Sequence, residues 1–163
     1  MRGYKILSVL FLVFVVINTG CELRDPQEKL ERQQISDYIK ALGDSTYVLY
    51  PSGLYYFEIV PGTGVSPMDG DTAFIKFHTM FLDYVWFDYN KPASKPYKGA
   101  VGTVAFPKGV NEGLKYMHVG GKAKLLTPSS LAYGFKGIQN VVPGSTPVLW
   151  YIELDSVKAV PGK

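Results

Sequence analysis

The chain has 163 residues, with 17 Lys and Arg against 14 Asp and Glu, and its formal net charge is +3. This length is typical of a single domain, and so small a charge provides no basic surface for a phosphate backbone, which excludes nucleic acid as the expected partner. One cysteine and two histidines exclude an internal disulfide framework and argue against a zinc site. Neither a metal ion nor another cofactor is expected.

The first twenty residues have the pattern of a signal peptide. A short basic start with Arg2 and Lys5 precedes an apolar run over residues 6–17, and small residues then lead to Cys21. The run is too short to span a bilayer comfortably. The arrangement resembles a bacterial lipoprotein signal, in which Cys21 becomes the lipidated first residue of the mature chain. The alternative is an uncleaved anchor with Cys21 as an ordinary buried thiol.

A helix is expected directly after this leader. Residues 25–28 read Asp-Pro-Gln-Glu, and aspartate caps helices while proline is favoured in the first turn. Ile35, Tyr38, Ile39 and Leu42 follow at helical spacing before Gly43. The sequence predicts an amphipathic helix over residues 26–42. It would act as a stalk or homodimerisation surface, or it would simply pack on its own domain.

From Tyr47 onward, short β-rich runs are separated by glycine, proline and aspartate, which predicts a sheet. The predicted strands cover residues 54–60, 72–82, 85–88, 122–127 and 148–157. In this half, only residues 111–117 favour a helix. Residues 128–147 form a long loop, and a loop of that length in a compact domain is usually functional.

Covalent catalysis is disfavoured, because the sequence has no nucleophile elbow and no metal-binding helix motif. His78 and His118 are interpreted as surface or locally satisfied histidines rather than catalysts. What remains is a set of aromatic and aliphatic side chains spread over strands, short helix and long loop, with the acid Asp88 among them. The apolar members are Phe77, Phe87, Tyr97, Phe106, Val110, Tyr133, Val142 and Trp150.

This ordered set resembles the FKBP-type peptidyl-prolyl isomerases, the macrolide-binding immunophilin family. The resemblance is carried by Val60-Pro61-Gly62-Thr63-Gly64, Asp69-Gly70-Asp71, Phe87-Asp88, Gly109-Val110-Asn111-Glu112-Gly113-Leu114, residues 117–125, Leu131-Ala132-Tyr133-Gly134 and residues 148–154. It implies an α+β fold, in which a half-open antiparallel β-sheet wraps around one short α-helix with the proline site between them. With the leader and the amino-terminal helix, it divides the chain into a signal peptide (1–20), a lipid-anchored linker with the amphipathic helix (21–52) and a prolyl isomerase domain (53–163).

The resemblance also implies roles for individual residues. Phe87, Asp88 and Tyr133 would be catalytic, with Tyr133 binding a substrate carbonyl. The substrate-binding residues would be Phe77, Tyr97, Phe106, Pro107, Val110, Val142 and Trp150. Three departures from the family pattern bear directly on activity: Val110 stands where tryptophan is usual, Phe77 stands for tyrosine, and Pro107 has no N–H to offer a ligand.

The implied activity is cis–trans isomerisation of X-Pro bonds in unfolded or extended proline-containing polypeptides. The implied setting is the bacterial cell envelope, with a lipid anchor in the outer membrane, where the protein would help envelope proteins to fold. Because of the three departures, activity is expected to be reduced. Two alternatives stay open: a non-catalytic chaperone or peptide-binding lipoprotein that keeps the fold, and a purely structural envelope lipoprotein.

Overall fold

The computed structural model describes residues 26–43, 46–89 and 95–160, so the expected signal peptide and Cys21 lie outside the described residues. The elements are α2 (Pro26–Ala41), β1 (Val48–Leu49), β2 (Tyr55–Val60), β3 (Thr72–Met80), β4 (Trp86–Tyr89), β5 (Tyr97–Ala100), α3 (Lys108–Tyr116), β6 (Lys122–Thr127), the 3-10 helix η1 (Ser129–Leu131) and β7 (Val148–Lys158). Within these ranges, no helix has both the length and the apolar character needed to cross a bilayer.

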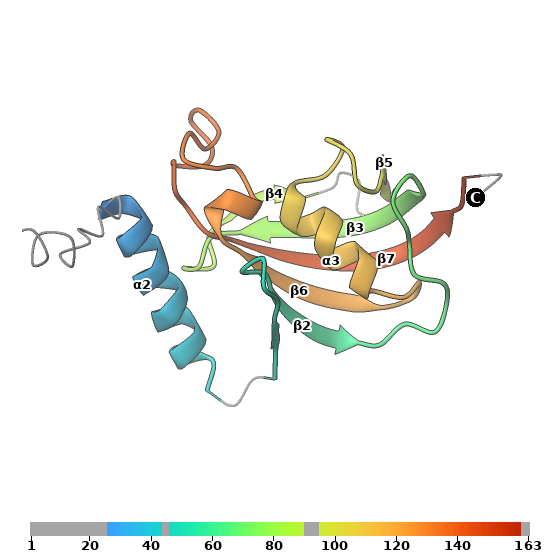
Figure 1. Cartoon of the computed structure of the whole chain (residues 1–163), viewed down its shortest axis with the longest axis horizontal. Coiled ribbons are helices and arrows are strands. Elements are labelled where there is room, and N and C mark those ends of the chain that lie inside the picture. Colours follow the sequence, from blue (N-terminus) through green and yellow to red (C-terminus); the bar gives the residue numbers. More distant parts are fainter. Residues whose placement is uncertain (1–25, 44–45, 90–94, 161–163) are drawn as a thin grey trace, which may run out of the picture.

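The strands form one antiparallel sheet in the order β1-β2-β6-β7-β3-β4 (Figure 1). β5 also pairs with β3, along Thr72–Ile75, whereas β4 pairs with the other end of β3, along His78–Met80. Buried and half-buried residues alternate along β3, because one face of the strand is more completely covered than the other. The predicted α+β fold, a half-open antiparallel sheet around one short helix with an additional amino-terminal helix, is confirmed.

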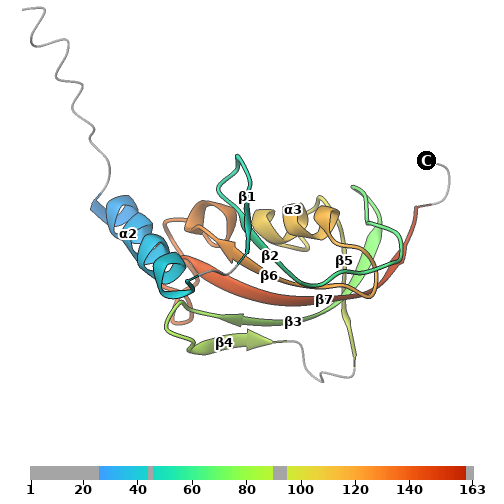
Figure 2. The same cartoon turned by 90° about the horizontal axis from the view of Figure 1, so that it is seen from below.

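α3 lies along one face of the sheet (Figures 1 and 2). Its buried residues Val110 and Leu114 belong to the main hydrophobic core. Two glycines let the helix backbone approach β6 closely. A Cβ atom at Gly113 would lie 2.4 Å from Leu125 Cδ1, and one at Gly109 would lie 2.5 Å from Thr127 Cγ2. Because these two positions have no side chain, the α3 backbone packs directly on β6 there.

α2 lies at one end of the sheet, apart from α3 (Figure 2). Its residues Ile35 and Tyr38 form a second core with sheet residues that alternate with those of the main core. The sheet residues of this second core are Phe57, Met80, Leu126 and Leu149. The amphipathic pattern of residues 26–42 thus reflects packing of the helix on its own domain, one of the two alternatives that the sequence left open.

The short helix begins earlier than its sequence indicates. α3 starts at Lys108, three residues before the predicted start at Asn111. Pro107 is its N-cap residue, with φ −55° and ψ 155°, and no side chain caps the helix. Because Lys108-Gly109 combines no capping side chain with a poor helix former, the sequence provided no start signal at this point.

Candidate functional site

Six aromatic rings follow one another across the side of the sheet that α3 covers, and we call this set the ring chain. It runs through Phe87, Tyr133, Trp150, Phe77, Tyr97 and Phe106, and neighbouring ring centroids are 5.7–6.3 Å apart. Such separations are typical of attractive aromatic pairs. Val110 and Val142 are buried in the same core. The structure therefore brings together aromatic and aliphatic residues that are spread over more than seventy positions of the sequence.

Trp150 occupies the middle of the ring chain and is fixed by hydrogen bonds. Its Nε1–H donates to Thr127 Oγ1 over 3.2 Å, and the Thr127 hydroxyl donates to the carbonyl oxygen of Val148 over 3.0 Å. Both bonds are buried and join the neighbouring strands β6 and β7. Because the indole N–H is satisfied inside the protein, the apolar ring can face the site without leaving an unpaired donor.

A β-bulge directs two consecutive residues of β4 toward the site. Thr79 pairs with Asp88, but the next residue of β3, Met80, pairs with Trp86, so Phe87 is an extra residue in β4. In an undistorted strand, Phe87 and Asp88 would point to opposite faces. The bulge lets both approach Tyr133: the Phe87 ring centroid is 6.3 Å from that of Tyr133, and Asp88 acts on Tyr133 electrostatically.

Tyr133 supplies the hydroxyl group of the ring chain. Burial, and secondarily the negative charge of Asp88, raises the pKa of Tyr133 to about 12. The phenol is therefore a protonated hydrogen-bond donor throughout the physiological pH range. Asp88 is exposed at the mouth of the site, so one acid and one donor lie at the same end of the ring chain.

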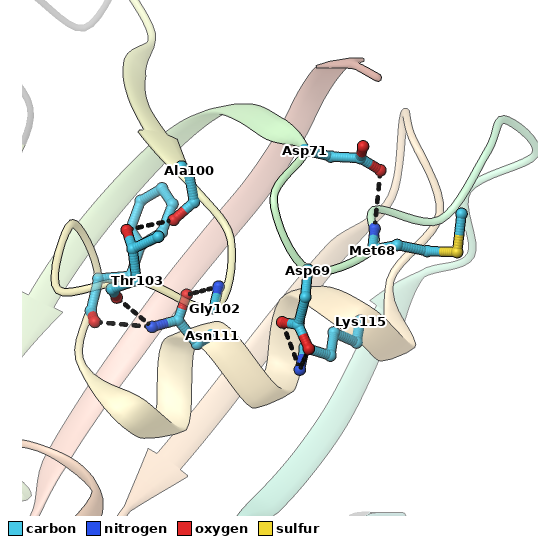
Figure 3. Close-up of polar contacts among 9 residues, drawn as sticks. Met68, Asp69, Asp71, Ala100, Gly102, Thr103, Asn111 and Lys115 are labelled. Carbon is cyan, nitrogen blue, oxygen red and sulfur yellow. Dashed lines mark hydrogen bonds and ion pairs between the residues drawn. The ribbon is translucent and has the colours of Figure 1, made fainter. Parts of the chain in front are cut away.

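Asn111 holds the segment that carries Phe106 and Pro107. Its Nδ2–H group donates to the carbonyl oxygens of Thr103 (2.7 Å) and Phe106 (2.8 Å), and its Oδ1 accepts from the Gly102 N–H (2.7 Å) (Figure 3). One turn further along α3, Lys115 pairs with Asp69 at 2.7 Å. Sequence reasoning missed Asn111 as a site residue, although an asparagine inside a short helix is a signal for such bonding.

The long loop that carries Tyr133 is folded on itself and tied to α2. The Gly134 N–H donates to the Ser129 carbonyl over 2.7 Å, and the Ser145 N–H donates to the Gly134 carbonyl over 3.0 Å. Two side chains of α2 bind opposite ends of the loop: the Glu31 carboxylate accepts hydrogen bonds from Ser129, and Gln27 Oε1 accepts one from the Ser145 hydroxyl. The amino-terminal helix therefore supports the loop.

Every residue predicted for the prolyl site lies in or next to the ring chain, and Cys21 lies outside the described residues. Pro107 caps α3 directly after Phe106, so this position offers no N–H to a ligand. The two histidines lie elsewhere: His78 packs on Trp86 with ring centroids 4.8 Å apart, and His118 is exposed after α3.

A separate groove lies beside the site, with a volume of about 1010 Å³. It is lined by α2, by residues around β1 and by the start of the long loop, and it contains no member of the ring chain. Volume alone would favour this groove as a binding site. We favour the ring chain as the site, because an acid, a protonated phenol and several packed aromatic rings converge there.

Comparisons with known proteins agree with the family resemblance of the sequence. The model of the family described as FKBP-type peptidyl-prolyl cis-trans isomerase matches residues 64–155. FkpA from Escherichia coli is 34% identical over 110 residues, which are 68% of this chain and 40% of that protein. FK506-binding protein 1A from Aspergillus fumigatus is 33% identical over 95 residues, 58% of this chain and 85% of that protein. The chain belongs to the FKBP-type peptidyl-prolyl cis-trans isomerase family.

Outer membrane protein MIP from Legionella longbeachae is 32% identical over 111 residues, 68% of this chain and 47% of that protein. The chain thus spans less than half the length of both FkpA and this relative. Among solved structures, a peptidyl-prolyl cis-trans isomerase from Pseudomonas syringae has a TM-score of 0.72 at 23% identity, covering 83% of this chain and 98% of its own. FkpA from Escherichia coli has a TM-score of 0.71 at 24% identity, covering 99% of this chain and 75% of its own. These two structural likenesses show the fold.

Proposed function

We propose that this protein catalyses the cis–trans isomerisation of X-Pro peptide bonds in unfolded or extended polypeptides. The observation that carries the proposal is the ring chain, with the protonated Tyr133 and the carboxylate of Asp88 together at one end. All of these residues fall within the segment that matches the family model. A proline ring would lie among the aromatic side chains, with the flanking peptide groups directed toward Tyr133 and Asp88.

The chemistry needs no nucleophile and no proton transfer. Rotation about an X-Pro bond is slow because amide resonance gives the C–N bond double-bond character, with a barrier of roughly 18–20 kcal/mol. The twisted state has lost this resonance and its charge separation, so a dry apolar site can favour it over the planar states. The Tyr133 hydroxyl would fix the orientation of a substrate carbonyl, while Asp88 would act on the rotating carbonyl or organise its neighbours.

The test is the exchange rate of a short X-Pro peptide, measured by exchange NMR with the purified full chain in detergent. We expect acceleration by the wild-type protein and a lower rate with Asp88→Val or Tyr133→Phe. Tyr116→Phe is the matched control, because it also removes one phenolic hydroxyl, whereas its ring stacks on Tyr50 outside the ring chain. A folded wild-type chain that leaves the exchange rate unchanged would refute the proposal.

A non-catalytic holding function is the second candidate, and two observations favour it. Pro107 removes a backbone donor from the site. In addition, apolar side chains are exposed on the loops beside the ring chain, including Val104, Val141 and Phe135, which is 74% exposed. Such side chains suit the capture of hydrophobic chain segments. This function predicts suppression of client aggregation that survives Asp88→Val but is weakened by Phe135→Ser, with no acceleration of X-Pro exchange.

We further propose that the protein is attached to the bacterial envelope, at the outer membrane, through a lipid on Cys21. The support is the leader pattern before Cys21, together with the similarity to a relative called outer membrane protein MIP. Because α2 begins at Pro26, four residues would separate Cys21 from the helix, and the five Cα–Cα steps between them reach at most about 18 Å. Cys21→Ser should move the protein from the membrane fraction to the soluble fraction, and mass spectrometry of the mature amino terminus would detect the lipid.

A homodimer through α2 would have to use the outer side of the helix, because Ile35 and Tyr38 are buried against the sheet of the same chain. Leu30 is an exposed apolar residue in the first half of α2, and it borders a groove shared with residues 81–84 and 143–147. Sedimentation of the wild type and of Leu30→Ser would test this association. A concentration-independent monomer would exclude it.

A further inference from the structure

The hydroxyl of Thr79 is a buried polar group beside the ring chain to which the proposed activity assigns no role. The residue has an exposed fraction of 0%, and among the described residues its Oγ1 atom has no hydrogen-bond partner. Burying an unpaired hydroxyl weakens a fold. Such a group is rare in native proteins and needs a physical reason.

The strand geometry shows where this hydroxyl points. Ala73, Ile75 and Phe77 of β3 belong to the core under α3, while Met80 belongs to the second core under α2. Because side chains of a strand alternate between its two faces, Thr79 shares the face of Phe77. The hydroxyl is therefore on the side of the sheet that carries the ring chain.

The two strands that flank β3 place Thr79 between two residues of the site. Its cross-strand partner in β7 is Trp150, and its partner in β4 is Asp88. Side chains directly opposite each other in an antiparallel pair have Cβ atoms about 4.5–5.5 Å apart. A carboxylate turned inward from the Asp88 position would therefore lie within reach of the Thr79 hydroxyl. In the structure Asp88 is exposed instead, and no hydrogen bond joins the two described side chains.

We propose that Thr79 is a positioning residue, whose hydroxyl donates a hydrogen bond to the Asp88 carboxylate when a proline peptide fills the site. The inference rests on the proposed isomerase function. A bound peptide excludes water from the mouth of the site, so the Asp88 carboxylate loses solvent hydrogen bonds and turns toward the unpaired hydroxyl of its cross-strand partner Thr79. Because the bond is absent from the free protein and present in the complex, it contributes to catalysis through differential binding.

The test compares three proteins in the same X-Pro exchange assay, namely wild type, Thr79→Val and Thr79→Ser. Valine keeps the shape of threonine but lacks the hydroxyl, so we expect kcat/KM to fall about tenfold, the size of a hydrogen bond to a charged group. Serine keeps the hydroxyl and should retain a rate close to that of wild type. In an Asp88→Val background, Thr79→Val should cause no further loss, because the acceptor has already been removed.

Thermal stability separates positioning from a structural role. Valine removes a buried unpaired hydroxyl, so the Tm of Thr79→Val should equal or exceed that of wild type. A lowered Tm, or a variant that does not fold, would overturn the inference, as would a wild-type rate in Thr79→Val or additive losses in the double variant. If the wild-type chain itself failed to accelerate exchange, the proposed function would fall together with this inference, whereas an active Thr79→Val would overturn the inference alone.

Discussion

The carboxylate of Glu31 in α2 accepts two hydrogen bonds from Ser129, a residue 98 positions further along the chain. Its Oε2 accepts the Ser129 hydroxyl over 2.7 Å, and its Oε1 accepts the Ser129 backbone N–H. Both residues are only 7% exposed. Ser129 begins η1, four residues before Tyr133, so the amino-terminal helix directly stabilises the start of the site loop.

Removing this carboxylate should destabilise the protein. Glu31→Ala leaves the N–H and the hydroxyl of Ser129 buried without their acceptor, and we expect a loss of about 2–3 kcal/mol in the free energy of unfolding in urea. Glu28→Ala is the matched control on the same helix, because Glu28 pairs with Arg32 in solvent and such pairs contribute only about 0.5 kcal/mol. Equal losses in the two variants would show that α2 does not depend on the Ser129 contact.

Substitution of Gly113 tests the close approach of α3 to β6. Alanine is the better helix former by about 1 kcal/mol, so propensity alone predicts that Gly113→Ala stabilises the protein. The added Cβ would instead press on Leu125, which is completely buried. We expect packing to outweigh propensity, with a net loss of about 1–2 kcal/mol in urea unfolding. The sign of the change decides the question, and a gain in stability would mean that α3 can move away from the sheet at little cost.

The stability of the fold should fall at alkaline pH. Burial raises the pKa of Tyr133 and that of Tyr56 to about 12, while an unfolded tyrosine titrates near pH 10. The folded state therefore holds these protons more tightly, and the resulting stabilisation is complete below pH 10 and lost as the pH rises toward 12. Urea unfolding between pH 8 and 12 should show this decline, with a shallower slope for Tyr133→Phe. An unchanged slope in that variant would mean that Tyr133 ionises in the folded protein as readily as in the unfolded chain.

The charge of Asp88 should be measurable at Tyr133. Asp88→Asn removes the smaller of the two causes that raise the Tyr133 pKa and leaves the larger one, burial. We therefore expect the pKa of Tyr133 to fall while staying above 10, as measured by NMR titration of its ring carbon next to the hydroxyl. Asp83→Asn, in the turn before β4, is a suitable control, since its carboxylate accepts a bond from the Val85 N–H instead. An unchanged Tyr133 pKa in Asp88→Asn would show that the Asp88 charge does not act on Tyr133.

The long strands and both helices could be predicted from local patterns, because each buries one face over several turns or alternations. β6 was predicted with its observed bounds, and α2 differs from its prediction only at the final residue. β1 and β5 were missed because two and four residues are too few for a periodic signal. The antiparallel sheet around a short helix came from the family resemblance, whereas the order of the strands was not predicted, since nothing local specifies that β2 pairs with β6.

Part of the site could also be predicted from sequence, and part depends on tertiary contacts. The members of the ring chain were predicted from their positions in the sequence, and the structure brings them together. Thr79, Asn111 and Glu31 were not singled out, because their importance depends on partners fixed elsewhere. A cross-strand register places Thr79 opposite Asp88, a loop conformation presents its carbonyls to Asn111, and tertiary packing brings Glu31 to Ser129.

Trp150 and Val110 can be used to test whether Trp150 fills the space left by the smaller Val110 side chain. Trp150 donates its hydrogen bond to Thr127, which lies against Gly109, the residue before Val110. Both apolar residues belong to the main hydrophobic core. Val110 is fully buried, and Val110→Trp should cost about 3 kcal/mol through overpacking. If Trp150 occupies the space of the missing tryptophan, adding Trp150→Phe should recover at least 0.5–1 kcal/mol relative to the sum of the single changes in urea unfolding. Strict additivity would show that the two sites are independent.

The central position of β7 constrains how the chain can fold during its synthesis. β7 lies between β6 and β3, yet among the described strands it comes last in the sequence and is therefore made after them. Until Val148–Lys158 has emerged, β3 and β6 have no common neighbour, and the face that α3 must cover is incomplete. Contacts between such distant segments form slowly, and unpaired strand edges favour aggregation. The sheet of this family member therefore cannot be completed until β7 has been made.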